Sequence, residues 1–267
     1  MNEGAKNPRE GRSLPAWLAD VVQSFELHAR RLVTADDVQR ARPELSRGLA
    51  RLALAELVRR GWLAPVGVRG TYEFIPGAVA GTYPSSDPWL VLRAELGRRP
   101  DAFHVGGMSA AWLRGYAQRR PARHLVVTTP LVNVPQPLRA TYRVLRTTPA
   151  PAHDRIDNLP VPTAPELVAE VAQLAPRLTL DSARGWLRRL FAEAPVDEVA
   201  RTLRDRGGAT RARAGYFAQV CGAEAHADVI ADLGPIGTGP YFTGSRSSGA
   251  AFSSRWRVYD TGRVGAP

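Results

Sequence analysis

Lysine, cysteine and long apolar runs are almost absent from this 267-residue sequence, in which Lys6 is the single lysine and Cys221 the single cysteine. One cysteine cannot form an internal disulfide, which is consistent with a reducing compartment. Without a CxxC pair or a cluster of histidines and cysteines, no metal site is expected. No apolar run approaches the roughly 20 residues that span a bilayer, and the polar residues 1–12 are expected to form a disordered leader rather than a signal peptide. These features favour a cytoplasmic protein.

The composition is that of a soluble globular protein long enough for two domains, with 44% hydrophobic and 23% charged residues. The formal net charge is +11, and every cation except Lys6 is an arginine. The excess of positive charge is spread evenly along the chain, which is typical of a coding bias towards arginine. Such a charge makes binding to nucleic acid electrostatically easy, but it does not locate a site.

Residues 13–80 contain, in order, the parts of a winged helix-turn-helix domain. Apolar spacing predicts a first helix that ends near His28, and Thr34 is a good N-cap for a short helix that ends near Arg40. A longer helix is expected over residues 43–60, because four of its residues share one apolar face: Ala50, Ala53, Leu54 and Leu57.

Gly61 follows two arginines and ends this helix. The next residues, 62–66 and 71–75, are strand-prone and are separated by a turn that contains Gly67, Arg69 and Gly70. A short glycine-containing turn between two such segments predicts a hairpin. In a winged helix domain this hairpin is the two-stranded wing that follows the recognition helix.

Residues 81–88 are expected to be a linker, and residues 89–267 a second domain. Its expected strands cover residues 124–129, 142–146 and 156–161, and its helices 165–174, 181–193, 196–206 and 211–231, with a break near Gly222. Segments 241–242 and 254–259 are expected to pair as a closing hairpin. The predicted fold class is α+β: an N-terminal winged helix-turn-helix, then a mixed α/β domain with a helical segment and a closing β-hairpin.

Five residues of the first domain are candidates for contact with DNA: Ser46, Arg47, Arg51, Arg59 and Arg69. Arg47 and Arg51 lie one helical turn apart and away from the apolar face, so both can face a groove. Arg69 at the tip of the predicted wing is suited to a minor groove or a phosphate. The alternative is that these arginines are simply solvated.

A second apolar line on the same helix, formed by Leu45, Leu49 and Leu52, needs a cover. Either the first helix or another subunit can supply it.

No set of acids, bases and nucleophiles forms a catalytic constellation in the sequence. Gly106-Gly107 between a strand and a helix resembles a phosphate-binding turn but lacks the GxGxxG spacing and the P-loop lysine. Ser109 is not in a GxSxG elbow. The histidines near carboxylates stand in ordinary surface patterns: His153 with Asp154 and Asp157, and His226 with Asp228 and Asp232. The sequence therefore predicts neither an enzyme nor a cofactor.

Several segments together resemble one family, the AbiEi antitoxins and their standalone relatives, which regulate bacterial type IV toxin–antitoxin systems. The similar segments are the helix end and hairpin RRGWL…GVRGTYEF, then FHVGGMSAAWLRGY, RHLVVTTP and LPVPTAPELVAEVA. Gly70 and Tyr72 match the second wing strand of the family, and the resemblance covers roughly residues 15–180. The wing tip departs from the family in carrying one arginine, Arg69, where relatives often carry two or more.

The resemblance implies a division of labour between the two domains. The N-terminal domain would bind inverted repeats in its own promoter and repress it, and the C-terminal domain would neutralise a nucleotidyltransferase-like toxin without a stable complex. Two other functions stay open. The winged helix can instead bind a protein partner, or it can target a nuclease to DNA. The oligomeric state is not predicted.

Overall fold

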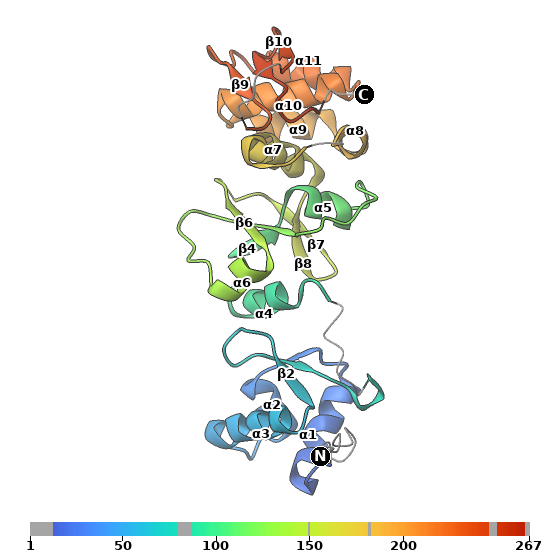
Figure 1. Ribbon diagram of the computed structural model, residues 1–267, viewed down its shortest axis with the longest axis vertical. Helices are drawn as coiled ribbons and strands as arrows, with labels where there is room; N and C mark the ends of the chain where they lie inside the picture. Colours follow the sequence, from blue (N-terminus) through green and yellow to red (C-terminus); the bar gives the residue numbers. More distant parts are fainter. Residues whose placement is uncertain (1–12, 80–86, 149, 181–182, 246–249, 265–267) are drawn as a thin grey trace, which may run out of the picture. The chain divides into compact units, whose positions relative to one another are not determined.

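The computed structural model describes residues 13–79, 87–148, 150–180, 183–245 and 250–264 (Figure 1). The chain divides into two compact units, Met1–Pro100 and Asp101–Pro267. Both units combine helices with small sheets, so the α+β class is confirmed. The predicted leader, 1–12, lies outside the described residues, as does most of the predicted linker, 81–88. The helix that follows the linker, α4(Leu90–Arg98), belongs to the first unit.

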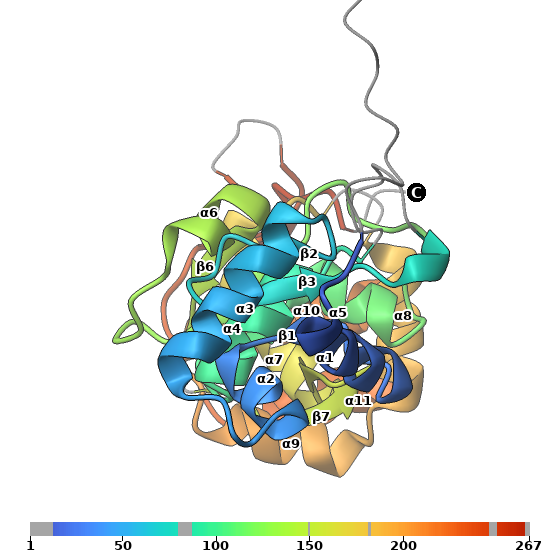
Figure 2. The same ribbon diagram turned by 90° about the horizontal axis from the view of Figure 1, so that it is seen from below.

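Three helices form the core of the first unit: α1(Ala16–Leu27), α2(Ala35–Ala41) and α3(Arg47–Arg59). Helices α2 and α3 lie side by side (Figure 2). The core gathers apolar residues from all three helices: Leu18, Val21, Val22, Phe25, Val38, Ala50, Ala53, Leu54 and Leu57. The four residues of the predicted apolar face of α3 are all in this core, which leaves the opposite face of α3 to solvent.

Local caps fix the ends of α2 and α3. Thr34 and Asp37 form a capping box, in which the Thr34 backbone N–H donates to Asp37 Oδ2 at 2.9 Å. The prediction that the longer helix begins at Pro43 is wrong. A turn covers Arg42 to Leu45, and α3 begins only at Arg47 because the Ser46 side chain accepts a hydrogen bond from the Leu49 backbone N–H.

A three-stranded antiparallel sheet completes this part of the unit. Its strands are β1(Leu32–Val33), β2(Leu63–Pro65) and β3(Tyr72–Phe74), in the order β1-β3-β2. The predicted hairpin is the pair β2–β3. Leu32 and Val33 form the third strand, because their backbone pairs with β3. A 3₁₀ turn, η2(Gly77–Val79), follows the sheet.

The turn between β2 and β3 depends on two glycines with positive φ, Gly67 at 79° and Gly70 at 76°. Such angles strain other residues, so glycine is needed at both positions. Val66 and Val68 are buried and pack against Leu90 and Ala94 of α4. The two valines hold the turn against α4, and the Arg69 side chain at its tip is exposed.

The second unit begins with a mixed sheet of β4(Phe103–Val105), β5(Leu125–Thr128) and β6(Arg143–Arg146), in the order β4-β5-β6. Strand β5 is antiparallel to β4 and parallel to β6. Helix α5(Gly107–Leu113) lies between β4 and β5 in the chain, and α6(Gln136–Thr141) lies between β5 and β6. Strand β5 is buried throughout, as expected of a central strand without period-two alternation.

A two-stranded hairpin replaces the single strand predicted over residues 156–161. Its strands are β7(His153–Ile156) and β8(Leu159–Pro162), joined by Asp157 and Asn158 at φ 49° and 59°. Positive φ at both central residues is the geometry of a type I′ turn, for which aspartate and asparagine are preferred. The single-strand prediction is wrong because these two residues reverse the chain.

The described residues after β8 then form a run of helices: α7(Ala164–Leu174), α8(Arg184–Glu193), α9(Val196–Arg204), α10(Gly208–Val220) and α11(Glu224–Asp232) (Figure 1). Helix α7 continues into a short 3₁₀ segment, η3(Ala175–Arg177). Helix α10 packs against α7, α8 and α11. The predicted break at Gly222 is confirmed, because this glycine, at φ 74°, separates α10 from α11.

A small sheet of β9(Tyr241–Phe242), β10(Phe252–Ser253) and β11(Val258–Tyr259) packs on α10 through β9 and β11. The closing hairpin is present, but its predicted pairing is wrong. The antiparallel partner of β11 is β10, and β9 pairs with β11 in parallel. A parallel pair cannot be joined by a tight turn, so β9 and β11 are not the two strands of one hairpin.

We expect Gly215→Ala to lower the free energy of unfolding by about 1–3 kcal/mol, the usual cost of overpacking a core. A Cβ added at Gly215 would lie 2.2 Å from the ring of Trp256. The indole cannot simply retreat, because Trp256 is buried and donates from Nε1 to Gln219 Oε1 at 2.7 Å. Urea unfolding measures the change. Gly185→Ala is the matched control, since nothing lies within 4 Å of its Cβ position, and an equal loss in both variants would contradict the prediction.

Candidate nucleic-acid interface

The outward face of α3 presents an arginine beside apolar and small side chains. Gly48, Arg51, Leu52 and Ala55 are all exposed, and their spacing puts them on the side of the helix opposite the core. Arg47 is exposed at the first turn of the same helix. A helix with this face outward can enter the major groove of DNA, which is wide enough to admit it.

Arg47 and Arg59, two of the predicted contacts, have acidic neighbours. Arg47 Nη2 lies 3.8 Å from Asp36 Oδ1, and both side chains are largely exposed, so the pair is weak. Arg59 binds Glu56 through two hydrogen bonds, from Nε to Oε2 at 2.8 Å and from Nη2 to Oε1 at 2.5 Å. These bonds from Arg59, together with one from Arg60, lower the pKa of Glu56 to about 2. The charge of Arg59 is therefore balanced within the helix.

Arg69 lies at the tip of the β2–β3 turn, between buried Val68 and Gly70, and its side chain is exposed. The Thr71 backbone N–H donates to the Val68 carbonyl at 3.1 Å and closes the turn around it. The turn thus holds one cation outward at a fixed point of the sheet.

Arg51 and Arg69 differ from every other arginine in the described part of the first unit. Each of the others has a carboxylate oxygen within 3.9 Å: Arg30, Arg31, Arg40, Arg42, Arg47, Arg59, Arg60, Arg93, Arg98 and Arg99. Arg51 and Arg69 have no ion-pair or hydrogen-bond partner among the described residues. Two uncompensated guanidinium groups are therefore available to an external anion.

Ser46, the fifth predicted contact, is the N-cap of α3. Its Oγ accepts from the Leu49 backbone N–H at 3.3 Å, and the residue is exposed. The cap uses an oxygen lone pair and leaves the hydroxyl proton free to donate to an acceptor. Ser46 therefore fixes where α3 begins and can still donate to a phosphate oxygen.

The second apolar line on α3, formed by Leu45, Leu49 and Leu52, is only partly buried. Leu45 is partly buried and packs on the core of the first unit. Leu49 and Leu52 are 49% and 64% exposed, so helix α1 does not cover them. Large apolar side chains that are exposed next to one another are candidates for an intermolecular contact.

In the second unit, a glutamate occupies the strand-to-helix turn that resembled a phosphate loop. Glu170 of α7 is buried; its Oε2 lies 2.5 Å from His104 Nε2, and its Oε1 accepts from the Gly107 backbone N–H at 2.9 Å. A Cβ at Gly106 would lie 2.6 Å from Glu170 Oε1. The glycines therefore allow a carboxylate of the chain itself to approach the turn.

A second buried polar group lies in the first turn of α5, at Ser109. Ser109 Oγ accepts from the Leu125 backbone N–H at 2.8 Å and lies 3.3 Å from His124 Nδ1. Arg120 Nε donates to His124 Nε2 at 3.1 Å. Burial, with Arg120 adding to it, lowers the pKa of His124 to about 4. Ser109 is fully buried, so this serine and histidine hold β5 against α5 and are closed to a substrate.

His124 makes the protein less stable in mild acid. Because its pKa is about 4 in the folded chain and about 6.5 when unfolded, the unfolded chain takes up the proton first. Stability is fully present above pH 6.5, and on the order of 2–3 kcal/mol is lost as the pH falls to 4. Urea midpoints of the wild type and of His124→Gln across this range test it. Parallel pH profiles in the two proteins would contradict the assignment to His124.

The other histidine–carboxylate groups singled out in the sequence make structural contacts. Arg114 Nη2 donates to Asp154, and Arg255 pairs with Asp228 at 2.7 Å. His226 is buried and its Nε2 donates to the Ala194 carbonyl at 2.8 Å, which ties α11 to the end of α8. These contacts tie neighbouring elements of the second unit together.

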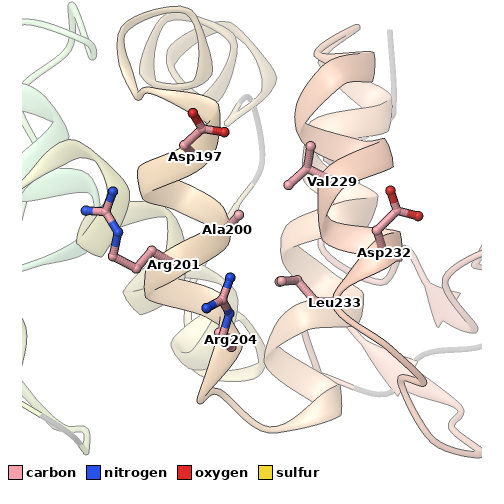
Figure 3. Close-up of a pocket in the computed structure, with 7 residues that line it drawn as sticks. All are labelled: Asp197, Ala200, Arg201, Arg204, Val229, Asp232 and Leu233. Atoms are coloured by element: carbon pink, nitrogen blue, oxygen red, sulfur yellow. The ribbon is translucent and has the colours of Figure 1, made fainter.

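A groove of about 560 Å³ lies between α9 and α11 (Figure 3). Val229 and Leu233 point from α11 towards α9, whereas Arg201 and Asp232 point away from the centre of the groove. Its floor is apolar and its charged groups do not converge on one point.

Within the described residues, no group of three or more histidine, cysteine, aspartate or glutamate side chains is close enough to hold a metal ion. Among the helices that the structure describes, none is long and apolar enough to span a membrane.

The described elements define an α+β protein of two units, and this fold occurs in a solved structure. The crystal structure of RV2827C protein from Mycobacterium tuberculosis is similar, with a TM-score of 0.74 and 25% sequence identity over 94% of this chain and 93% of that one. No family model matches the sequence. No curated protein matches it significantly.

Proposed function

We propose that the first unit is a winged helix-turn-helix that binds double-stranded DNA and that the chain is a sequence-specific transcriptional regulator. Helices α2 and α3 are the helix-turn-helix, α3 is the recognition helix, and β2, β3 and their turn are the wing. In such domains the second helix enters the major groove, and a basic residue at the wing contacts a minor groove or phosphates.

One observation carries the proposal: Arg51 and Arg69 are the two described arginines of the first unit without an acidic partner. They lie on the outward face of α3 and at the tip of the turn, which are the two places where a winged helix meets DNA. An arginine kept free of carboxylates is suited to the bidentate contact with guanine O6 and N7. Arg47, whose pair with Asp36 is weak, supports this contact from the start of the helix, as does Ser46. Arg59, which is bonded to Glu56, is a weaker candidate for DNA contact.

A mobility shift tests the proposal on the DNA directly upstream of the gene, against scrambled DNA of equal length, at two salt concentrations. Specific retention at the higher salt is the expected result, because base contacts survive the salt that weakens phosphate contacts. Equal binding to both duplexes that disappears with salt would leave only non-specific attraction to an arginine-rich chain. Cleavage of the DNA that a chelator abolishes would instead indicate a nuclease.

The resemblance to AbiEi antitoxins extends the proposal to the second unit. On this basis the chain represses its own promoter through inverted repeats and neutralises a nucleotidyltransferase-like toxin. The two activities are separable by experiment. The full-length double variant Arg51→Ala/Arg69→Ala should fail to repress the promoter. It should still restore growth to cells that express a nucleotidyltransferase-like toxin encoded next to the regulator. Loss of both activities in this variant would contradict a division of labour between the units.

A further inference from the structure

Leu52 is an apolar side chain in a position that the fold itself does not explain. It is 64% exposed on the outward face of α3, directly after unpaired Arg51. Two of its neighbours one turn away, Gly48 and Ala55, are small and exposed, and a third, Leu49, is apolar and 49% exposed. At Gly48 the nearest atom to an added Cβ is Ser46 Oγ at 3.8 Å, so nothing inside the unit requires glycine there. The small flanks let the leucine and the arginine project furthest from the helix.

The charges around Leu52 favour one occupant. The single acid on α3, Glu56, is already bonded to Arg59 and Arg60. A two-fold contact between two copies of this face would bring the same surface against itself. It would therefore set Arg51 near its own counterpart with no carboxylate of α3 free to balance them. A polyanion that also presents an apolar group fits the face better than a second copy of the chain does.

Duplex DNA presents one apolar group in its major groove, the C5-methyl of thymine. Resting on the function proposed above, we infer that Leu52 contacts a thymine methyl next to the guanine that Arg51 reads. The half-site would then place a thymine beside that guanine. Recognition at this point uses both apolar contact and bidentate hydrogen bonding, the two kinds of direct readout that the major groove offers.

The test uses the upstream duplex made in two forms, one with thymine and one with deoxyuridine throughout, which removes only the methyl groups. The wild type should bind the uracil duplex about fourfold more weakly for each methyl that Leu52 covers, the value of one buried methyl-sized group. Leu52→Ala should bind the thymine duplex more weakly and no longer distinguish the two. Leu27→Ala is the matched control, an exposed leucine of the same unit on α1, and should retain the wild-type ratio.

The outcomes separate this inference from the proposed function. If the wild type retains the thymine duplex specifically but binds the uracil form equally well, the regulator stands and the thymine contact is overturned. The same holds if wild type and Leu52→Ala share one thymine-to-uracil ratio. Self-association that Leu52→Ala abolishes, with DNA affinity unchanged, would assign this face to a second copy and overturn the inference. No specific retention of either duplex would overturn the proposed function itself.

Discussion

Alanine in place of Arg51 should weaken binding to the specific duplex by about 1–3 kcal/mol, roughly 5- to 150-fold, and should relax the base preference at one position. The reason is that Arg51 has no competing carboxylate among the described residues, so its guanidinium keeps all its donors for a base edge. Binding to scrambled DNA should change much less. The measurement is a pair of titrations, specific and scrambled, at one fixed salt concentration.

Arg69→Ala should behave differently although it removes the same charge. At the tip of the β2–β3 turn the side chain is suited to phosphates, whose contacts carry no sequence information. Its loss should weaken specific and scrambled DNA about equally and reduce the slope of log affinity against log salt by about one. Because the two arginines lie on separate elements, their effects should add in the double variant.

Arg98→Ala is the control for both variants. Arg98 is an exposed arginine of the same unit, on α4, but it lies 3.9 Å from Glu95. The Arg98→Ala variant removes one positive charge that lies outside α3 and the β2–β3 turn. It therefore measures what the loss of net charge alone does to DNA binding. If Arg51→Ala lowers specific and scrambled binding by the same factor, Arg51 contacts phosphate and the proposed reading of guanine is wrong.

The helices of the first unit were predictable because their signals are local. Thr34, Ser46 and Gly61 stand within a residue or two of the helix ends that they fix. The expected start of α3 at Pro43 lies four residues before its first residue, Arg47. Ser46 decides the start instead, since its side chain satisfies a backbone N–H that proline cannot reach.

The strands of the second unit were predicted less well than its helices. One strand is expected over residues 156–161, but Asp157 and Asn158 favour a turn and reverse the chain between β7 and β8. The parallel pair β9–β11 joins segments that are far apart in the sequence. No short-range sequence pattern therefore predicts this pairing. The observed bounds of helices α7 to α11 agree closely with the predicted ones, because glycine and proline residues mark the helix ends in the sequence.

The candidate site shows the same limit. That Arg59 bonds to Glu56 follows from their spacing on one helix. That Arg51 and Arg69 have no acid depends on where every other carboxylate of the unit lies, including Asp36 across the turn from Arg47. A property defined by the positions of all the acids cannot be read from one segment. Candidate contacts were therefore predictable, but their ranking was not.

The loss of the Glu170 carboxylate should have the largest effect on stability, about 3–5 kcal/mol for Glu170→Ala. Glu170 lies on α7, is 2% exposed, and joins His104 of β4 and the Gly107 N–H at the start of α5. In the alanine variant both partners stay buried without an acceptor. Each of them has lost its hydration on folding without gaining a hydrogen bond in return, which lowers the free energy of unfolding. The free energy of unfolding, measured in urea, should fall by that amount.

Glu170→Gln separates the carboxylate from the shape of the side chain. Glutamine keeps an oxygen for the Gly107 N–H and offers an N–H₂ to His104, so we expect a loss of only about 1 kcal/mol. Glu166→Ala is a second control on the same helix. Its carboxylate is less buried and bonds to Arg206 at 2.8 Å, so its removal should cost less than that of Glu170. If Glu170→Ala and Glu166→Ala lower the stability equally, Glu170 does not join β4, α5 and α7 as argued, and the paired glycines at 106 and 107 need another explanation.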